Sequence, residues 1–318
     1  MTSVANFKAD HAIIVGFGSI GMRHAELLVD LGLSVTVVSR RDVGPYPSLK
    51  DLALALKDQP EAYVVVANET SEHDNTLLTL QDSGHRGLVL VEKPLFATSV
   101  SDSKINLSPD TVDRIVVGYN LRFHPLLLTL RDRLAGRRVH TIEAAVGQYL
   151  PDWRPQRDYR TGYSASRVGG GGALRDLSHE IDYMLWLFGP WNRVAALSGC
   201  SGELELDSED FAHLLIDGRE FSAATLGLDY LDRNVRRAVT VNHEGGTTRL
   251  DFIAGTLTEN GEVMDTATLD RNYTYREQHL AVLTGQSDKF CSYKEGLVAM
   301  HALEAAERAV EKGEWVTL

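Results

Sequence analysis

Residues 12–21 read AIIVGFGSIG, and this stretch decides the fold of the first part of the chain. It opens on an apolar, β-branched run typical of a buried strand, and the helical stretch MRHAELLVDLG follows it. Between the two, three glycines stand in the spacing G-x-G-x-x-G, which in this context predicts a dinucleotide site at the start of a helix. The residues that we expect at the phosphates are Gly16, Phe17, Gly18, Ser19, Ile20 and Gly21.

The end of the second predicted strand, SVTVV at 34–38, indicates which dinucleotide is bound. An NAD-specific site usually has an Asp or Glu about 20 residues beyond the glycines. This chain has Ser39, Arg40 and Arg41 there, and guanidinium groups bind phosphate through paired hydrogen bonds. We therefore expect these three residues to bind the 2′-phosphate of NADP, preferred over NAD, although Asp42 lies next to them.

Three further apolar runs continue the alternation of strands and helices. They read AYVVVA at 62–67, GLVLVE at 87–92 and DRIVVGYN at 113–120, with helices predicted from about 71 to 81 and around Ser99. This alternation predicts a doubly wound parallel sheet over residues 1–121, with ligands beyond the carboxyl ends of its strands. The residues placed there as cofactor contacts are Asn68, Thr70, His73, Glu92, Lys93 and Asn120.

The composition restricts the class of protein. With 318 residues the chain is long enough for two domains, and its net charge of −12 argues against nucleic acid or anionic lipid as a partner. Cys200 and Cys291 are the only cysteines and form no metal-binding motif, so we predict no metal. We also expect no membrane span and no signal peptide, and hence a cytoplasmic protein.

A second informative stretch, GGGGALRDLSHEIDYML at 169–185, predicts a helix with two faces. Leu177, Ile181, Met184 and Phe188 form an apolar stripe suited to packing. A separate flank gathers polar residues at helical spacing, which suggests a catalytic role. These residues are Asp176, His179, Glu180 and Tyr183.

The motif VEKPLFA places Lys93 after a strand, and other motifs follow in order: NETSEH, GYNLRFHP at 118–125, GGGALRDLSHEID and the closing EGLVAMHALEAAERAVEKGEWVTL. With GFGSIG, they make the chain resemble the Gfo/Idh/MocA oxidoreductases, named for glucose–fructose oxidoreductase and inositol dehydrogenase. The variant SHEIDYMLWLFG and the segment QYLPDWRP look like members that accompany the synthesis of surface-polysaccharide or sialic-acid-like sugars.

The resemblance implies a catalytic lysine in EKP and a catalytic histidine on the first helix of the second domain, which are Lys93 and His179 here. The family often adds an aspartate four residues before the histidine, whereas Asp176 precedes His179 by three. The partner of His179 is therefore Asp176, Glu180 or Tyr183. We expect Lys93 and His179 to meet across the cleft between the domains.

From residue 122 to 318 the alternation stops, and polar–apolar runs with turns predict an α+β domain with an open, mainly antiparallel sheet. The resemblance implies that the free face of this sheet forms a homodimer or homotetramer. A segment rich in aromatic residues and arginines, GQYLPDWRPQRDYRTGYSASR, suits a sugar through its aromatic faces and a carboxylate or phosphate through its arginines. The residues expected to bind substrate are Lys93, Arg122, Tyr149, Trp153, Arg157, Tyr159, Tyr163, Asp176 and His179.

These features together predict an NADP(H)-dependent oxidoreductase that moves hydride to or from a carbinol carbon of a sugar, sugar acid or cyclitol. Two alternatives remain. One is redox-neutral chemistry of the glycosidase or lyase type, in which hydride leaves and returns within one turnover. The other is a dinucleotide-binding regulator without catalysis, which would have no need of Lys93 and His179.

Overall fold

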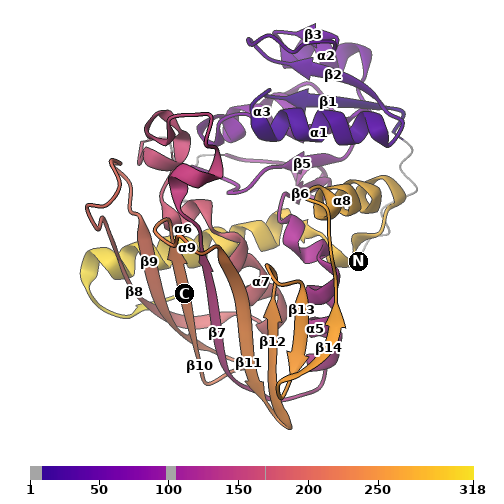
Figure 1. Cartoon of the computed structure of the whole chain (residues 1–318). Coiled ribbons are helices and arrows are strands. Elements are labelled where there is room, and N and C mark those ends of the chain that lie inside the picture. Colours follow the sequence, from indigo (N-terminus) through magenta and orange to yellow (C-terminus); the bar gives the residue numbers. More distant parts are fainter. Residues whose placement is uncertain (1–8, 98–104, 169) are drawn as a thin grey trace. The chain divides into compact units, whose positions relative to one another are not determined.

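The computed structural model of the chain describes residues 9–97, 105–168 and 170–318 (Figure 1). The helix predicted around Ser99 lies outside these residues. The predicted helix from about 71 to 81 is present, as a short 3-10 turn followed by an α-helix.

The chain divides into two compact units, and neither is a continuous stretch of sequence. They are Met1–Phe123 with Asp270–Leu297, and His124–Leu269 with Val298–Leu318. The segment 270–297 thus packs with the first unit although it follows most of the second. Our assignment of the cofactor to 1–121 and of the substrate to 122–318 stays a prediction.

The first unit contains a seven-stranded sheet. Its strands are β1 (His11–Val15), β2 (Ser34–Val38), β3 (Ser48–Leu49), β4 (Tyr63–Val66), β5 (Val89–Val91), β6 (Ile115–Val117) and β15 (Cys291–Ser292). The order is β15-β6-β5-β4-β1-β2-β3, and all neighbours run parallel except β15, which is antiparallel to β6. From β3 to β6 this is the 3-2-1-4-5-6 order of dinucleotide-binding sheets, so the predicted doubly wound sheet is confirmed.

The central strands are continuous apolar runs because helices cover both faces of a parallel sheet. Every residue of β4 is buried, and β1 is buried after its first residue. The helices of this unit are α1 (Ser19–Asp30), α2 (Leu52–Asp58), α3 (His73–Asp82), α4 (Pro109–Val112) and α8 (Tyr273–Thr284), with 3-10 turns η1 (Thr70–Glu72), η2 (Asn120–Phe123) and η6 (Ser287–Lys289). Helix α8, from the returning segment, contacts α1 and η2.

The second unit contains a nine-stranded sheet. Its strands are β7 (Val139–Gly147), β8 (Trp191–Gly199), β9 (Phe211–Gly218), β10 (Ala223–Asp229), β11 (Arg236–His243), β12 (Gly246–Asp251), β13 (Thr256–Glu259), β14 (Glu262–Thr266) and β16 (Val316–Thr317). The order is β14-β13-β12-β11-β7-β10-β9-β8-β16, and the pair β7–β10 is parallel whereas the other neighbours are antiparallel. The predicted open, mainly antiparallel sheet is confirmed.

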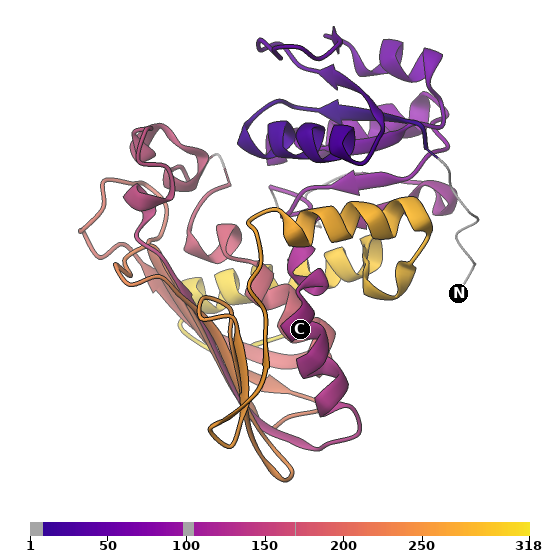
Figure 2. The same cartoon turned by 45° about the vertical axis from the view of Figure 1, so that its right-hand side comes forward.

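Helices lie along one side of this sheet. Those of the second unit are α5 (Pro125–Leu134), α6 (Ala173–Asp176), α7 (His179–Phe188) and the later part of α9 (Tyr293–Lys312), with 3-10 turns η3 (Leu150–Trp153), η4 (Tyr159–Thr161) and η5 (Tyr163–Ala165). Figure 2 shows the sheet close to edge-on, with α5 and α7 on the same side. Accordingly, buried and more exposed residues alternate along β9.

The helix predicted over the second informative stretch is two helices. Helix α6 ends at Asp176, and α7 begins at His179, so Asp176 does not share a helix with the histidine. The apolar stripe is confirmed, because Leu177, Ile181, Met184 and Phe188 are all buried. In the described part of the chain, no helix is both long and apolar enough to cross a membrane.

Candidate functional site

The three glycines of the turn between β1 and α1 differ in how closely other parts of the protein approach them. Gly16 has a φ of +93°, and a Cβ there would stand 2.5 Å from the backbone N and Cα of Asn68. A Cβ at Gly21 would overlap the carbonyl oxygen of Gly16. A Cβ at Gly18, by contrast, would have no atom of a described residue within 4 Å. The protein itself needs Gly16 and Gly21, whereas the space at Gly18 fits a group that approaches the backbone from outside.

The same turn presents unused hydrogen-bond donors. The first hydrogen bond of α1 runs from the N–H of Met22 to the carbonyl of Gly18, at 2.9 Å. The N–H groups of Ser19, Ile20 and Gly21 therefore have no acceptor within the helix, and the helix dipole adds partial positive charge there. An anion such as a pyrophosphate suits this place.

Phe17 contributes to this turn through its backbone only. Its side chain is buried, and its ring packs edge-on against Tyr46 with centroids 5.7 Å apart. The ring therefore supports the turn from inside the first unit.

Beyond β2, the structure leaves the two arginines at the surface. Arg40 and Arg41 are exposed, and the hydroxyl of Ser39 accepts a hydrogen bond from the N–H of Arg41 at 3.0 Å. Asp42 accepts a hydrogen bond from the N–H of Gly44 at 3.0 Å, which closes a local turn. The carboxylate next to the arginines thus already has a role in the loop.

The end of β4 carries three of the expected cofactor contacts. The amide of Asn68 donates to the hydroxyl of Thr76 at 2.9 Å, and Thr70 begins η1. His73 is buried, its Nδ1 lies 3.1 Å from the carbonyl oxygen of Leu95, and burial lowers its pKa. His73 therefore supports the loop that follows Lys93, whereas Asn68 and Thr70 are partly exposed.

The end of β5 carries Glu92 and Lys93. The Glu92 side chain is 11% exposed, and its Oε1 lies 2.9 Å from Nε2 of His24 on α1. A Cβ at Gly118, beyond β6, would come within 2.8 Å of the same oxygen. Lys93 follows directly and is partly exposed, which leaves it accessible at the carboxyl end of the sheet.

Two expected contacts near β6 are buried. The amide of Asn120 donates to the hydroxyl of Thr274 at 2.7 Å. Arg122, which we expected to bind substrate, is 2% exposed and donates through Nη1 to the carbonyl of Phe290 at 2.9 Å and to Glu295 at 2.8 Å. Its charge is paired inside the first unit, where Arg122 binds the returning segment 270–297. We therefore no longer expect Arg122 to bind substrate.

In the second unit, the carboxylate of Asp176 accepts hydrogen bonds from three hydroxyl groups. It accepts hydrogen bonds from Tyr163 at 3.2 Å, Ser164 at 2.6 Å and Tyr230 at 3.1 Å. The ring of Trp153 packs edge-on against Tyr230, with centroids 5.3 Å apart. Sequence reasoning placed Asp176, Tyr163 and Trp153 at one site but missed Ser164 and Tyr230, which no motif marks.

Helix α7 separates the proposed partners of His179. His179 is its first residue and is partly exposed. Glu180 is fully buried, with its Oε1 2.8 Å from Nε of Arg237 on β11, and Tyr183 is fully buried as well. The structure therefore places Glu180 and Tyr183 inside the unit. The prediction that they share one polar flank with His179 is wrong, because His179 is partly exposed and they are not.

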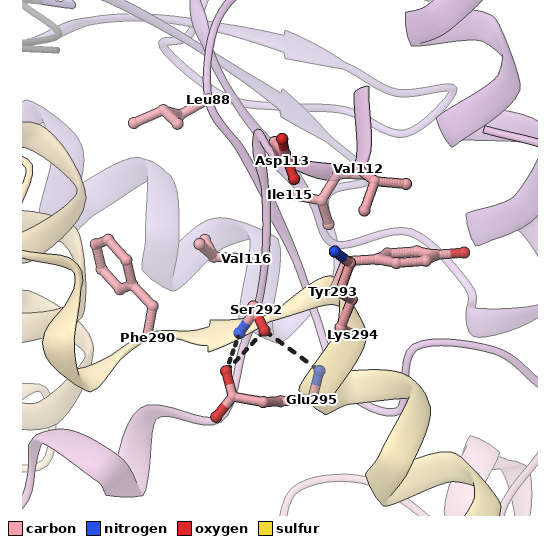
Figure 3. Close-up of a pocket in the computed structure, with 10 residues that line it drawn as sticks. All are labelled: Leu88, Val112, Asp113, Ile115, Val116, Phe290, Ser292, Tyr293, Lys294 and Glu295. Carbon is pink, nitrogen blue, oxygen red and sulfur yellow. Dashed lines mark hydrogen bonds between the residues drawn. The ribbon is translucent and has the colours of Figure 1, made fainter. Parts of the chain in front are cut away.

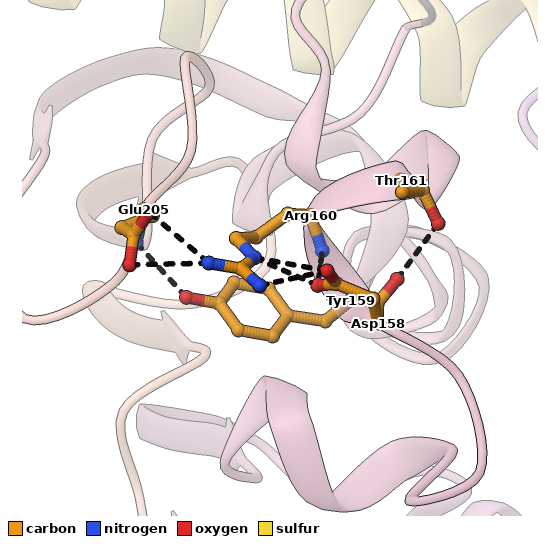
Figure 4. A network of polar contacts seen from close by, with 5 residues as sticks. All are labelled: Asp158, Tyr159, Arg160, Thr161 and Glu205. Atoms are coloured by element: carbon orange, nitrogen blue, oxygen red, sulfur yellow. Dashed lines mark hydrogen bonds and ion pairs between the residues drawn. The ribbon is translucent and has the colours of Figure 1, made fainter.

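The aromatic and arginine-rich loop is held by its own acidic residues (Figure 4). Arg160 donates to Asp158 at 2.8 Å and to Glu205 at 3.3 Å, and Asp158 accepts the N–H of Arg160 as well. The hydroxyl of Tyr159 accepts the N–H of Glu205 at 3.0 Å. The loop is thus fastened to the segment around Glu205, and the charge of Arg160 is neutralised there.

Other side chains of the loop differ in whether they contact a neighbouring residue. Tyr149 lies under the guanidinium of Arg233, whose Cζ is 4.0 Å from the ring centroid. Arg157 is exposed, and its guanidinium makes no hydrogen bond or ion pair with any described residue. Arg157 is therefore available to an anion, unlike Arg160, whose charge is paired with Asp158 and Glu205.

A pocket of about 170 Å³ lies elsewhere in the first unit (Figure 3). Leu88 and Asp113, which line it, precede β5 and β6, so the pocket is at the amino ends of the strands. Glu295 there accepts hydrogen bonds from the N–H and hydroxyl of Ser292, which caps the start of α9. This pocket is therefore separate from the residues at the carboxyl ends.

Comparison with known families bears on the second unit. Residues 128–249 match the model of the GFO/IDH/MocA C-terminal domain. The chain carries a GFO/IDH/MocA C-terminal domain. The resemblance indicated by the motifs is thereby confirmed, and Asp176, His179 and the parallel pair β7–β10 all lie within this domain. A comparison with curated proteins found no match.

Solved structures share the fold over nearly the whole chain. GenD2 from gentamicin A biosynthesis, in complex with NAD, is 23% identical with a TM-score of 0.79, covering 99% of this chain and 98% of that one. A levoglucosan dehydrogenase, in complex with NADH and L-sorbose, is 15% identical with a TM-score of 0.81, covering 96% and 98%. The WlbA dehydrogenase from Bordetella pertussis, in complex with NADH and UDP-GlcNAcA, is 17% identical with a TM-score of 0.77, covering 98% and 99%.

Proposed function

We propose that this protein is an NADP(H)-dependent oxidoreductase that transfers hydride to or from a carbinol carbon of a sugar, sugar acid or cyclitol. The open space at Gly18 carries the proposal, because it lies before the N–H groups of α1 that have no acceptor within the helix, and the sheet of this unit has the dinucleotide-binding order. Support comes from the GFO/IDH/MocA C-terminal domain and from the structural neighbours solved in complex with NAD or NADH.

The preference for NADP rests on Arg40 and Arg41. Both guanidinium groups are exposed beyond β2, and Asp42, the acid nearest to them, is engaged in its own turn. A 2′-phosphate would receive two cationic donors there, whereas a bare ribose hydroxyl would find no unengaged acid at residues 39–42. Ser39 adds a hydroxyl next to them. The surface therefore favours the phosphorylated dinucleotide.

The chemical step needs two proton-handling groups from the chain. A bound nicotinamide supplies the hydride acceptor or donor. His179 takes the proton of the reacting hydroxyl, because a neutral imidazole can act as a general base near neutral pH. Lys93 hydrogen-bonds the same oxygen and stabilises the negative charge that develops on it. Asp176, which gathers three hydroxyl groups in the second unit, contributes to the substrate site.

The substrate is a carbohydrate-like molecule, held by the loop around Trp153. Tyr149, Trp153, Tyr159 and Tyr163 supply aromatic surface for sugar C–H groups. Arg157 is exposed and its charge is not neutralised by a described residue, so it is suited to a carboxylate or phosphate on the substrate. An anionic sugar, such as one that occurs in surface-polysaccharide metabolism, fits this arrangement.

The protein forms a homodimer or homotetramer through the free face of the nine-stranded sheet. Leu197 on β8 and Leu215 on β9 are 67% and 44% exposed, although they stand on neighbouring strands of the sheet. A second copy of the same face would remove this apolar surface from water. Light scattering on wild type and Leu197→Lys tests this, and a monomeric wild type contradicts it.

A dinucleotide titration and a substrate screen test the proposed function. Calorimetric titration should show NADP binding more tightly than NAD to the wild type. Free sugars, sugar acids, cyclitols and nucleotide-linked sugars are then offered with each dinucleotide, and absorbance follows the reduced nicotinamide. Binding of neither dinucleotide overturns the proposal, and product formation without net nicotinamide reduction assigns redox-neutral chemistry instead.

A further inference from the structure

A buried chain of hydrogen bonds links three side chains of the first unit to Glu92. The hydroxyl of Tyr63 lies 3.0 Å from Nδ1 of His279, Nε2 of His279 lies 2.8 Å from Nδ1 of His24, and Nε2 of His24 lies 2.9 Å from Oε1 of Glu92. Tyr63, His24 and His279 are each 0% exposed. Their elements, β4, α1 and α8, are far apart in sequence, and the two histidines are separated by 255 residues.

Hydrogen-bond chemistry allows this chain few arrangements. A neutral imidazole donates through one nitrogen and accepts through the other, so each ring passes the direction of the chain on to the next. If Glu92 is ionised, it can only accept, so His24 donates through Nε2 and accepts at Nδ1. His279 then also donates through Nε2, and its Nδ1 accepts the hydroxyl proton of Tyr63. Every bond then points toward Glu92.

At the end of the hydrogen-bond series that lies away from Glu92, Tyr63 and His279 do not change their protonation states. Burial, and secondarily the charge of Glu92, raises the pKa of Tyr63 well above its ordinary value, so its hydroxyl keeps its proton. Burial, and secondarily His24, holds the pKa of His279 well below its ordinary value, so this ring stays neutral. A chain that ends in a fully buried phenol is not a route for protons to solvent. It is suited to fixing the position of the group at its other end.

The carboxylate at that end has one oxygen occupied and one available. Oε1 of Glu92 receives His24, and Gly118 lacks the Cβ that would crowd this oxygen. Among the described residues, none donates a hydrogen bond to Oε2, and the side chain is 11% exposed at the carboxyl end of β5. Lys93 follows Glu92 directly in the sequence. Glu92 therefore offers an acceptor beside the lysine that we assign to catalysis.

We propose that Tyr63, His279 and His24 are positioning residues whose hydrogen bonds all donate toward Oε1 of Glu92, and that Oε2 of Glu92 is directed to the bound cofactor. The role of Oε2 rests on the proposed function, because it requires a bound cofactor. The direction of the hydrogen bonds from Tyr63 to Glu92 does not depend on it. The groups around it include Tyr275, whose ring packs edge-on against His24 at 5.6 Å, and Arg23, whose Cζ lies 5.0 Å from the Tyr275 ring centroid.

The direction of the chain can be measured without any activity. Protein labelled with ¹⁵N-histidine is examined by long-range ¹H–¹⁵N NMR near neutral pH, and the variants His24→Gln and His279→Gln assign the two rings. We expect both rings to be neutral, with the proton on Nε2 in each. A proton on Nδ1 of both rings would mean that Glu92 is protonated, and a doubly protonated His24 would mean that the chain divides there. Either result overturns the proposal.

Dinucleotide titration tests whether His24 acts through Glu92. His24→Leu and Glu92→Gln should each weaken binding about 10-fold, the range for one hydrogen bond to a charged group. The double variant should be little weaker than the weaker single variant, because the two changes remove one function. Independent, additive losses overturn the proposal.

Two further variants separate positioning from folding. His24→Gln keeps an N–H that can donate to Glu92, and it should bind dinucleotide within about 3-fold of wild type. His85 is a matched control, since it is 3% exposed in the same unit but has no side-chain partner among the described residues. His85→Leu should bind dinucleotide normally, and a loss equal to that of His24→Leu overturns the proposal. If wild type binds no dinucleotide, the proposed function fails while the NMR result still stands.

Discussion

Replacing Gly18 by alanine separates the needs of the fold from those of the ligand. The backbone at Gly18 has φ −82° and ψ −169°, an extended conformation that alanine adopts freely. Because no atom in the described part of the chain lies within 4 Å of the new Cβ, the free energy of unfolding should change by less than about 1 kcal/mol. The methyl group does occupy the space assigned to the pyrophosphate. Losing one hydrogen bond to that charged group costs about 1.5–3 kcal/mol, which weakens dinucleotide binding by about 10- to 150-fold.

Gly21→Ala is the contrasting variant, because its Cβ would overlap the carbonyl oxygen of Gly16 and neither atom belongs to a flexible side chain. It should lower the free energy of unfolding by about 1–3 kcal/mol. Gly199→Ala, with its nearest neighbour a ring atom of Phe211 at 3.4 Å, is the neutral control. Chemical denaturation and calorimetric titration measure the two effects. If Gly18→Ala binds dinucleotide as tightly as wild type, or unfolds as easily as Gly21→Ala, the space at Gly18 does not belong to a pyrophosphate.

Four further outcomes are expected. Arg40→Ala should weaken NADP binding about 10- to 150-fold and leave NAD binding unchanged, and an equal effect on both dinucleotides would remove the 2′-phosphate assignment. His179→Ala should lower kcat by about 10²–10⁴-fold with dinucleotide affinity intact, and near-normal turnover would make His179 structural. Adding Lys93→Ala to His179→Ala should cost little more than the worse single change, whereas multiplied losses would mean that the two act separately. Arg157→Ala should raise KM for an anionic substrate more than Arg160→Ala, which already has acidic partners, and dissociation of the oligomer instead would make the loop an interface.

Local patterns were sufficient to predict the two sheets. Continuous apolar runs such as YVVV at 63–66 are typical of strands covered on both faces, and the alternation with helices indicated parallel neighbours. The polar–apolar runs after residue 122 indicated a sheet with one covered face. Both predictions depend on residues within one element, which is why the sequence alone supports them.

The site was less predictable, because its contacts join distant parts of the chain. The spacing of Asp176 and His179 suggested one helix, but Leu177, with φ −95° and ψ 27°, ends α6 before α7 begins. Arg122 looked like a ligand group until Glu295, from the returning segment, was seen to pair with it. The link between His24 and His279 likewise joins residues that no local pattern relates.

We propose that the protein carries out net hydride transfer, with Lys93 and His179 handling the proton of the same hydroxyl. The most direct measurement is the absorbance of reduced nicotinamide when wild type, Lys93→Ala and His179→Ala are each offered the best substrate of the screen with its preferred dinucleotide. We expect net reduction or oxidation of the nicotinamide by wild type, and a loss of kcat in both variants while each still binds dinucleotide. Product formed by wild type without any net change in the nicotinamide, or variants that turn over like wild type, would contradict it.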